Sequence, residues 1–169
     1  DYIRDTYNKP GNVFCGLVHR LDRPTSGIVI FAKTGKALAR MNKIFEQRQI
    51  QKFYYAVVQN LPAKKQDRLV HYLKKDARKN RSFTRPADDK QAKKAELSYS
   101  LFASSQRYHL LEVELHTGRH HQIRAQLAAI GSPIKGDLKY GFARSNHDAS
   151  ISLHAGRIVF AHPVSKEVL

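Results

Sequence analysis

The chain has 169 residues, of which 41% are hydrophobic, so it is long enough to form one domain with its own core. It carries 30 lysine and arginine residues against 14 aspartate and glutamate residues, a formal net charge of +16 that is typical of nucleic-acid-binding domains. Cys15 is the single cysteine, which excludes an intramolecular disulfide, and we expect it to be a small buried side chain.

The sequence shows neither a secretory signal nor a membrane-spanning segment. The first ten residues are polar and mixed in charge, unlike a secretory signal. No apolar run approaches the ~20 residues that a membrane-spanning helix needs. We therefore expect a cytoplasmic protein with no membrane partner.

Hydrophobic periodicity and turn residues predict the elements in chain order. Helices are predicted over residues 1–8, from Thr34 to about Arg48, and from Thr117 to about Ile130. Strands are predicted over 13–21, 27–33, 51–59, 95–103, 108–116 and 153–161, and 27–33 has the continuous β-branched run of a strand buried on both faces.

Two stretches are predicted to be irregular. The basic stretch 74–94 is an exposed excursion, either a solvated loop or an arm that contacts phosphates. Residues 134–144 are a turn-rich loop. The order of elements predicts a single domain over 1–169 of the α+β class, a mainly antiparallel mixed β-sheet flanked by a few helices.

The stretch HRLDRPTSG, residues 19–27, places Asp22 between two arginines, Arg20 and Arg23. Residues before proline avoid the helical region, so Asp22 is expected in a loop at a strand end, where functional groups are common. An equally good alternative is an aspartate that only accepts turn hydrogen bonds from Thr25, Ser26 or the backbone.

A second candidate constellation is HTGRHHQIRAQL, residues 116–127. With Thr117 as a helix cap, His120 and Arg124 lie four residues apart and share a face. The positive helix N-terminus and Arg119 favour an anion there, either a phosphate or the Asp22 carboxylate. The alternative is a basic amphipathic helix that packs through its apolar side.

Other catalytic classes are disfavoured by what the sequence lacks. His116, His120 and His121 have no second set of ligands, so we expect no metal. There is no Gly-x-Ser-x-Gly elbow, no glycine-rich phosphate loop, and no second carboxylate of the kind most glycoside hydrolases use. A lone carboxylate kept ionised by arginine, on a domain that binds polyanions, points to chemistry at a nucleotide's glycosidic bond.

Four motifs follow one another from Gly16 onward: GLVHRLDRPTSGIVIFAKT, KFYYAVV, TGRHHQIRAQLAAIGSPIKGDLKYG and LHAGRIVFAHPVSKE. In this order they resemble the motifs of the RluA family of RNA pseudouridine synthases. The resemblance implies the catalytic fold of that family and the isomerisation of uridine to pseudouridine in structured ribosomal or transfer RNA. The base is detached at N1, turned and rejoined through C5, with no cofactor or metal.

The resemblance also implies roles for residues at matching positions. Asp22 is the catalytic aspartate and Arg124 is its ion-pair partner. Tyr54 packs against the target base and is a candidate for the proton transfer from C5, whereas Tyr55 faces the other side of the strand. Whether Asp22 attacks C1′ or removes a proton from C2′ is left open.

RNA contacts are expected around this centre. Arg20 is similar to a residue that enters the RNA stack as the target nucleotide flips out. Further RNA contacts are expected from Lys52, Arg119 and His121. Ile134 and Leu138 are the candidates for the apolar wall of the base pocket.

The sequence also departs from the family pattern. NKPGN, residues 8–12, looks like the family's Lys-Pro-x-Gly strand motif but lies so near Asp22 that we expect a loop. We therefore expect a catalytic core without the N-terminal strands or an S4 domain, cut short at both ends, and acting as a monomer. The main alternative is a non-catalytic RNA-binding or ribosome-assembly protein with the same fold; a nucleoside or glycoside hydrolase is a third possibility.

Overall fold

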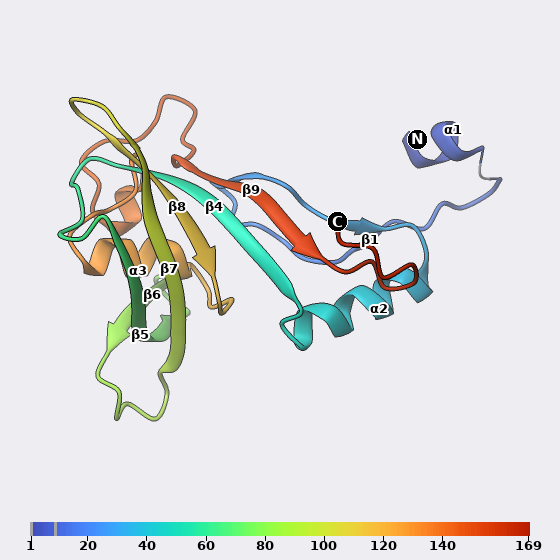
Figure 1. Ribbon diagram of the computed structural model, residues 1–169, viewed down its shortest axis with the longest axis horizontal. Coiled ribbons are helices and arrows are strands. Elements are labelled where there is room, and N and C mark those ends of the chain that lie inside the picture. The colour runs from blue at the N-terminus through green and yellow to red at the C-terminus, as the bar shows by residue number, and fades with distance from the viewer. Residues whose placement is uncertain (1, 9) are drawn as a thin grey trace.

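The computed structural model describes residues 2–8 and 10–169 and has one large twisted β-sheet at its centre (Figure 1). The sheet has seven strands in the order β2-β9-β4-β8-β7-β5-β6. Their bounds are β2 Ser26–Gly27, β4 Ile50–Val58, β5 Gln66–Asp76, β6 Arg81–Arg85, β7 Lys93–Ser104, β8 His109–Leu115 and β9 Leu153–Phe160. All pairings are antiparallel except that of β2 with β9, which confirms the mainly antiparallel mixed sheet.

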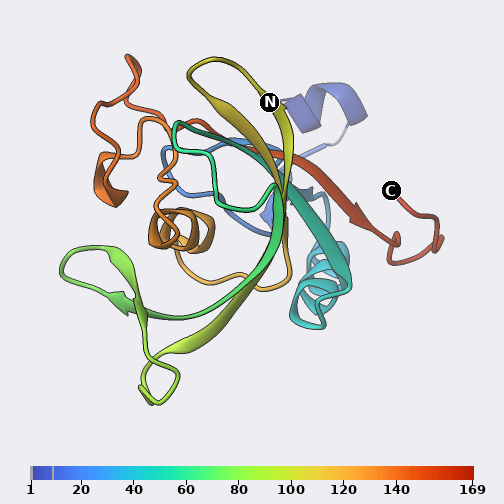
Figure 2. The ribbon, with the colours of Figure 1, turned by 60° about the vertical axis from the view of Figure 1, so that its left-hand side comes forward.

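Helices and a small ribbon surround this sheet. The helices are α1 Tyr2–Tyr7, α2 Gly35–Glu46, α3 Gln122–Ala129 and the 3₁₀ turn η1 Leu138–Tyr140. A two-stranded antiparallel ribbon joins β1 Gly16–Leu17 to β3 Phe31–Ala32. Figure 2 shows α3 against one face of the sheet and α1 standing apart from it. No helix in the described part of the chain is long and apolar enough to cross a membrane.

The core lies between the sheet and α3, and strand alternation decides which residues enter it. In β8, Leu111 and Val113 are fully buried, while Glu112 and Glu114, which alternate with them, face the other side. Ala56 and Val58 of β4 join the same cluster, and Tyr54 packs against its edge. Lys52 and Tyr54 therefore share the face of β4 that α3 covers, as the alternation predicts.

The helix predicted after Thr34 is confirmed as α2. Its N-cap is Thr34, whose Oγ1 accepts a hydrogen bond from the backbone N–H of Ala37 at 3.1 Å. The predicted helix over 1–8 is confirmed as α1, although residue 1 lies outside the described residues. Residue 9 of the expected loop over 8–12 also lies outside them.

The prediction of a continuous buried strand over 27–33 is wrong. Only Ser26–Gly27 and Phe31–Ala32 are strands, and they belong to different sheets. Gly27 has φ +127°, and a Cβ there would lie 2.4 Å from the carbonyl oxygen of Ala155, so the chain turns away at this close approach. Ile28 and Phe31 are consequently exposed. Of the strand predicted over 13–21 only Gly16–Leu17 is regular, and Cys15 is exposed instead of buried.

The basic stretch 74–94 is more regular than predicted. It contains the end of β5, all of β6 and the start of β7. β5 and β6 pair in register from Tyr72 with Arg85 to Asp76 with Arg81, so the stretch is an antiparallel hairpin. The sequence of this stretch favours a loop because few of its residues are apolar, so the strand pattern is not visible.

The third helix begins later than predicted, at Gln122 instead of Thr117. Thr117 does not cap it: its Oγ1 donates to Gln122 Oε1 at 2.8 Å and accepts from the backbone N–H of Glu96 at 2.8 Å. These bonds fasten residues 117–121 to β7 as a loop. The helix ends as predicted before Gly131, which has φ +79°.

Candidate active site

A hollow of about 210 Å³ lies beside Asp22, where three segments far apart in the sequence meet. The loop before β2 supplies Arg20 and Asp22, and β4 supplies Lys52 and Tyr54. Arg119, His121 and Arg124 come from α3 and the loop before it, and apolar walls come from Leu115, Ile123 and Leu153. The structure thus brings all seven of the residues predicted for catalysis or RNA contact to one place.

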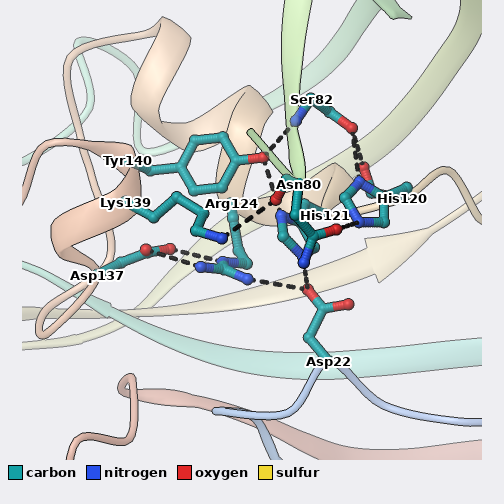
Figure 3. A network of polar contacts seen from close by, with 9 residues as sticks. All are labelled: Asp22, Asn80, Ser82, His120, His121, Arg124, Asp137, Lys139 and Tyr140. Atoms are coloured by element: carbon teal, nitrogen blue, oxygen red, sulfur yellow. Dashed lines mark hydrogen bonds and ion pairs between the residues drawn. The ribbon is translucent and has the colours of Figure 1, made fainter. Parts of the chain in front are cut away.

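The Asp22 carboxylate points toward α3, and its contacts converge on one oxygen. Arg124 Nη1 donates to Asp22 Oδ2 at 3.4 Å, and His121 Nε2 lies 3.8 Å from the same atom (Figure 3). The turn is held by the backbone instead, since the N–H of Thr25 donates to the carbonyl oxygen of Asp22 at 2.8 Å. In the described part of the chain, Asp22 Oδ1 has no hydrogen bond or ion pair and is available to a bound molecule.

Arg124 is held in place by a second carboxylate, Asp137, which the sequence analysis did not single out. Its Nε and Nη2 donate to the two oxygens of Asp137 at 2.7 and 2.9 Å. Both residues are buried, with Asp137 only 1% exposed. Burial opposes the charge on Arg124, but Asp137 and then Asp22 raise its pKa, so it is a cation throughout the neutral range.

Asp137 has a sequence signal that could have identified it. A buried guanidinium has five N–H donors, and one carboxylate in a loop cannot satisfy them. Acids are scarce in this chain, and Asp137 lies in the PIKGD segment directly after the helix that carries Arg124.

A polar chain runs from the hairpin to Asp22. The backbone N–H of Ser82, on β6, donates to Tyr140 Oη at 2.8 Å, and Tyr140 Oη lies 3.1 Å from His121 Nδ1 (Figure 3). Burial is the largest cause that lowers the pKa of His121 to about 4, and Arg124 adds to it while Asp22 opposes it. His121 is therefore neutral at pH 7.

The two neighbouring tyrosines of β4 face opposite sides of the sheet, as alternation predicts. Tyr54 lines the hollow, whereas Tyr55 donates to Glu112 Oε1 at 3.3 Å and packs edge-on against Phe102. Burial, and next the charge of Asp22, raise the pKa of Tyr54 to about 12. Its hydroxyl is consequently protonated at neutral pH, next to the carboxylate.

His19 and Lys52 complete the wall of the hollow on the side of α2. The His19 ring stacks on Phe45 with 5.2 Å between centroids, and its Nε2 accepts the backbone N–H of Ile30 at 3.2 Å. This bond ties the Asp22 loop to the segment between β2 and β3. Burial, and then Arg48, lower the pKa of Lys52.

A second, larger hollow of about 650 Å³ opens on the outer side of Asp22. We call it the cationic trough. Its charged lining is Arg20, Arg23, Lys75, Arg119, Arg124 and Lys139, with Asp22 as the one acid. Lys75 belongs to the β5–β6 hairpin, so the folded chain brings part of the basic stretch to the site.

Ile134 and Leu138, predicted as walls of the base pocket, are not brought to either hollow. Ile134 is fully buried in the core and bridges Val58 of β4, because it enters the cluster under α3. Leu138 is 57% exposed on η1. The apolar walls come from strand and helix residues instead.

The three histidines considered as metal ligands point to different partners. His116 contacts Ser98 Oγ at 2.8 Å, His120 contacts Ser82 Oγ at 2.9 Å, and His121 contacts Tyr140. Within residues 2–8 and 10–169, no three His, Cys, Asp or Glu side chains are arranged to hold a metal ion.

Comparison with known proteins defines the class of protein that has this fold and site. Residues 2–129 match the family model described as RNA pseudouridylate synthase, and this span includes the Asp22 loop, β4 and α3. The chain belongs to the RNA pseudouridylate synthase family.

Individual relatives agree with this assignment. The chain is 35% identical over 180 residues to tRNA pseudouridine synthase C of Haemophilus ducreyi, covering 95% of this chain and 71% of the relative. It is 32% identical to ribosomal large subunit pseudouridine synthase D of Zymomonas mobilis, covering 89% of this chain and 49% of the relative. These matches confirm the resemblance to RluA-type enzymes. The chain spans about half the length of several such relatives.

Solved structures confirm the fold. Human RNA pseudouridylate synthase domain containing 4 superposes with a TM-score of 0.77 at 22% identity, covering 92% of this chain and 69% of that one. At this identity the likeness concerns the fold alone.

Proposed function

We propose that this chain is the catalytic domain of an RNA pseudouridine synthase, an isomerase that converts uridine to pseudouridine in structured RNA. The observation that carries the proposal is the Asp22 carboxylate. One of its oxygens faces Arg124 and His121, the other has no partner among the described residues, and Asp22 lines a hollow together with Tyr54. A carboxylate held this way suits attack on a sugar.

Asp22 Oδ1 is the reacting atom in this proposal. Either it bonds to C1′ of the ribose while the C1′–N1 bond breaks, or it takes the proton from C2′ as that bond breaks and leaves a glycal. In both routes the bonding electrons remain on the detached uracil. After the base turns, C5 bonds to C1′ while the Asp22 Oδ1–C1′ bond breaks or, in the glycal route, while Asp22 returns the proton to C2′. The C5 hydrogen then leaves as a proton and N1 gains one. Substrate and product are isomers, so the overall reaction consumes no redox or group-transfer cofactor.

Tyr54 is proposed to pack against the base and to take part in the proton transfer from C5. Its raised pKa makes the phenol a hydrogen-bond donor in the free protein. The charge of Asp22 is the second cause of that high value, after burial. A neutral phenol accepts the C5 proton only as it gives its own hydroxyl hydrogen to another acceptor, so Tyr54 is proposed to relay this proton.

The cationic trough is proposed to bind the RNA backbone on both sides of the target nucleotide. Its six lysine and arginine side chains surround the entrance to Asp22. A uridine in folded RNA must leave its stack to reach the hollow, at a cost of a few kcal/mol, and Arg20 at the rim is proposed to fill the space it leaves. We expect the chain to act as a single domain and a monomer on ribosomal or transfer RNA, the RNA classes named for its relatives.

The proposal is tested by incubating the purified chain with unmodified transcripts of ribosomal and transfer RNA that carry tritium at C5 of uridine. We expect tritium release together with pseudouridine in the digested RNA. Release of free uracil instead would indicate a nucleoside hydrolase. RNA binding with neither product would indicate the non-catalytic RNA-binding protein.

A further inference from the structure

We infer that His121 is a positioning residue: a neutral imidazole whose Nε2–H is directed at Oδ2 of Asp22 because Tyr140 donates to Nδ1 on the opposite side of the ring. This inference rests on the proposed function of Asp22. It assigns to Tyr140 and Ser82, which do not touch the hollow, the task of setting which His121 nitrogen carries the hydrogen.

The direction of the hydrogen bonds follows from which groups are able to donate. The Ser82 N–H can only donate, so Tyr140 Oη is an acceptor of that bond at 2.8 Å. Burial raises the pKa of Tyr140, so its hydroxyl keeps a hydrogen that needs an acceptor. His121 Nδ1, at 3.1 Å, is the acceptor in reach. Donation the other way would leave a buried phenolic hydrogen unpaired, which is unfavourable.

Neutral histidine carries one ring hydrogen, so an acceptor Nδ1 fixes that hydrogen on Nε2. Nε2 is the atom that lies 3.8 Å from Asp22 Oδ2. Catalytic hydrogen bonds are often long before substrate is bound and shorten in the complex. His121 and Arg124 then hold the same carboxylate oxygen, and Oδ1 is turned to the ribose.

The backbone conformation of His121 is unusual and supports its role in positioning Asp22. His121 has φ +51°, in the left-handed region that a residue with a Cβ seldom adopts, and it stands at the N-cap of α3. Its side chain does not cap the helix. The conformation instead directs the ring between Tyr140 and Asp22, as Figure 3 shows.

The inference predicts a nuclear magnetic resonance signature that is independent of activity. Nitrogen-15 shifts of the imidazole distinguish the Nδ1–H and Nε2–H forms, and His121 is identified as the signal pair lost in His121→Gln. We expect the Nε2–H form in the wild-type protein and a shift toward a mixture in Tyr140→Phe, which keeps the ring but lacks the hydroxyl. A wild-type His121 with the hydrogen on Nδ1 would overturn the inference, whether or not the chain is an enzyme.

Kinetics then test the positioning role itself. Asparagine tolerates the left-handed backbone but is too short to reach Asp22, so His121→Asn is expected to lower the single-turnover rate roughly 10- to 100-fold, as losses of orienting residues do. His121 faces Asp22, so RNA affinity is expected to fall by less than the rate does. Glutamine has an N–H donor that reaches further, so His121→Gln is expected to recover part of the rate.

The matched control is His109→Gln. His109 is the first residue of β8, at the opposite end of the strand from Leu115, and it contacts Ser104. It is expected to keep the wild-type rate. Equal rates in His121→Asn and wild type would refute the positioning role. Losses that follow only the fall in melting temperature, equal in His121→Asn and His121→Gln, would also refute it. Failure of the proposed function appears differently, as a wild-type chain without conversion.

Discussion

Arg124 donates two short hydrogen bonds to Asp137, at 2.7 and 2.9 Å, and one longer bond, at 3.4 Å, to Asp22. The paired geometry with Asp137 is the stronger arrangement for a guanidinium and a carboxylate. Asp137 therefore fixes the position of Arg124, and Asp22 receives a donor that is already in place. Of the two carboxylates, Asp22 is the more exposed.

The first prediction concerns stability. Asp137→Ala leaves the Arg124 guanidinium buried without its main partner, so we expect the free energy of unfolding to fall by about 3–5 kcal/mol. Urea denaturation followed by circular dichroism measures the change.

The double variant Arg124→Met, Asp137→Leu is the control for this effect. Replacing a buried ion pair by apolar side chains of similar volume is often neutral, so this variant should regain most of the lost stability. It should still fail to convert uridine, because Asp22 has lost its guanidinium. A double variant as unstable as Asp137→Ala would show that the pair is not the source of the loss.

The second prediction separates the two tyrosines of β4. Tyr54→Phe keeps an aromatic ring in the hollow but removes the hydroxyl, so RNA affinity should persist while conversion falls at least 100-fold, as expected when a proton-transfer group is lost. Tyr55→Phe loses only the 3.3 Å bond to Glu112 on the opposite face and should convert at close to the wild-type rate. Single-turnover rates and RNA titrations measure both properties. A larger loss in Tyr55→Phe would mean that the wrong face has been assigned.

The third prediction is a loss of stability at mildly acid pH. The pKa of His121 is about 4 in the folded protein against an ordinary value of 6.5, so below pH 6.5 the unfolded chain takes up a proton that the folded chain refuses. The associated stability is complete above 6.5 and is lost as the pH falls toward 4, up to ~3 kcal/mol. His19, His71 and His120, whose pKa values are also lowered, act in the same direction.

Urea midpoints at about pH 7.5 and pH 5 test this prediction. His121→Gln should lose less stability between the two values than the wild-type protein. An identical loss in both would show that His121 takes up its proton over the same pH range in the folded and unfolded states.

The fourth prediction concerns the salt dependence of RNA binding. Each lysine that neutralises a phosphate contributes to the slope of log affinity against log salt concentration through counterion release. Lys75→Ala, in the cationic trough, should reduce the magnitude of that slope by about 1. Lys36→Ala, on α2 and outside the trough, should leave it unchanged. Fluorescence titrations at several salt concentrations distinguish the two, and equal slopes in all three proteins would remove Lys75 from the interface.

Much of the sheet could be predicted because its signals are local. The alternation of Leu111 and Val113 with glutamates, and the aromatic run of 51–59, define β8 and β4 within a few residues. The break at Gly27 could not be predicted in this way. It results from the close approach of Ala155, more than a hundred residues later, and a β-branched run looks the same in a buried strand and in an extended loop.

The candidate site likewise contains residues that the sequence motifs predict and residues that they do not. Asp22, Tyr54 and Arg124 lie in distinctive motifs, and the structure brings them together. Predicting Asp137 requires one to recognise that a buried guanidinium has more donors than a single carboxylate can satisfy. The contact from Ser82 through Tyr140 to His121 links residues of a hairpin, a 3₁₀ turn and a helix cap, so no spacing in the sequence reports it.

Asp22 is proposed to carry out the chemistry. Tritium release from C5-labelled RNA in a single turnover tests this role in Asp22→Asn, which keeps the size of the side chain and removes its charge. We predict no release above background, with RNA affinity as tight as that of the wild-type protein. Release at the wild-type rate would contradict the claim.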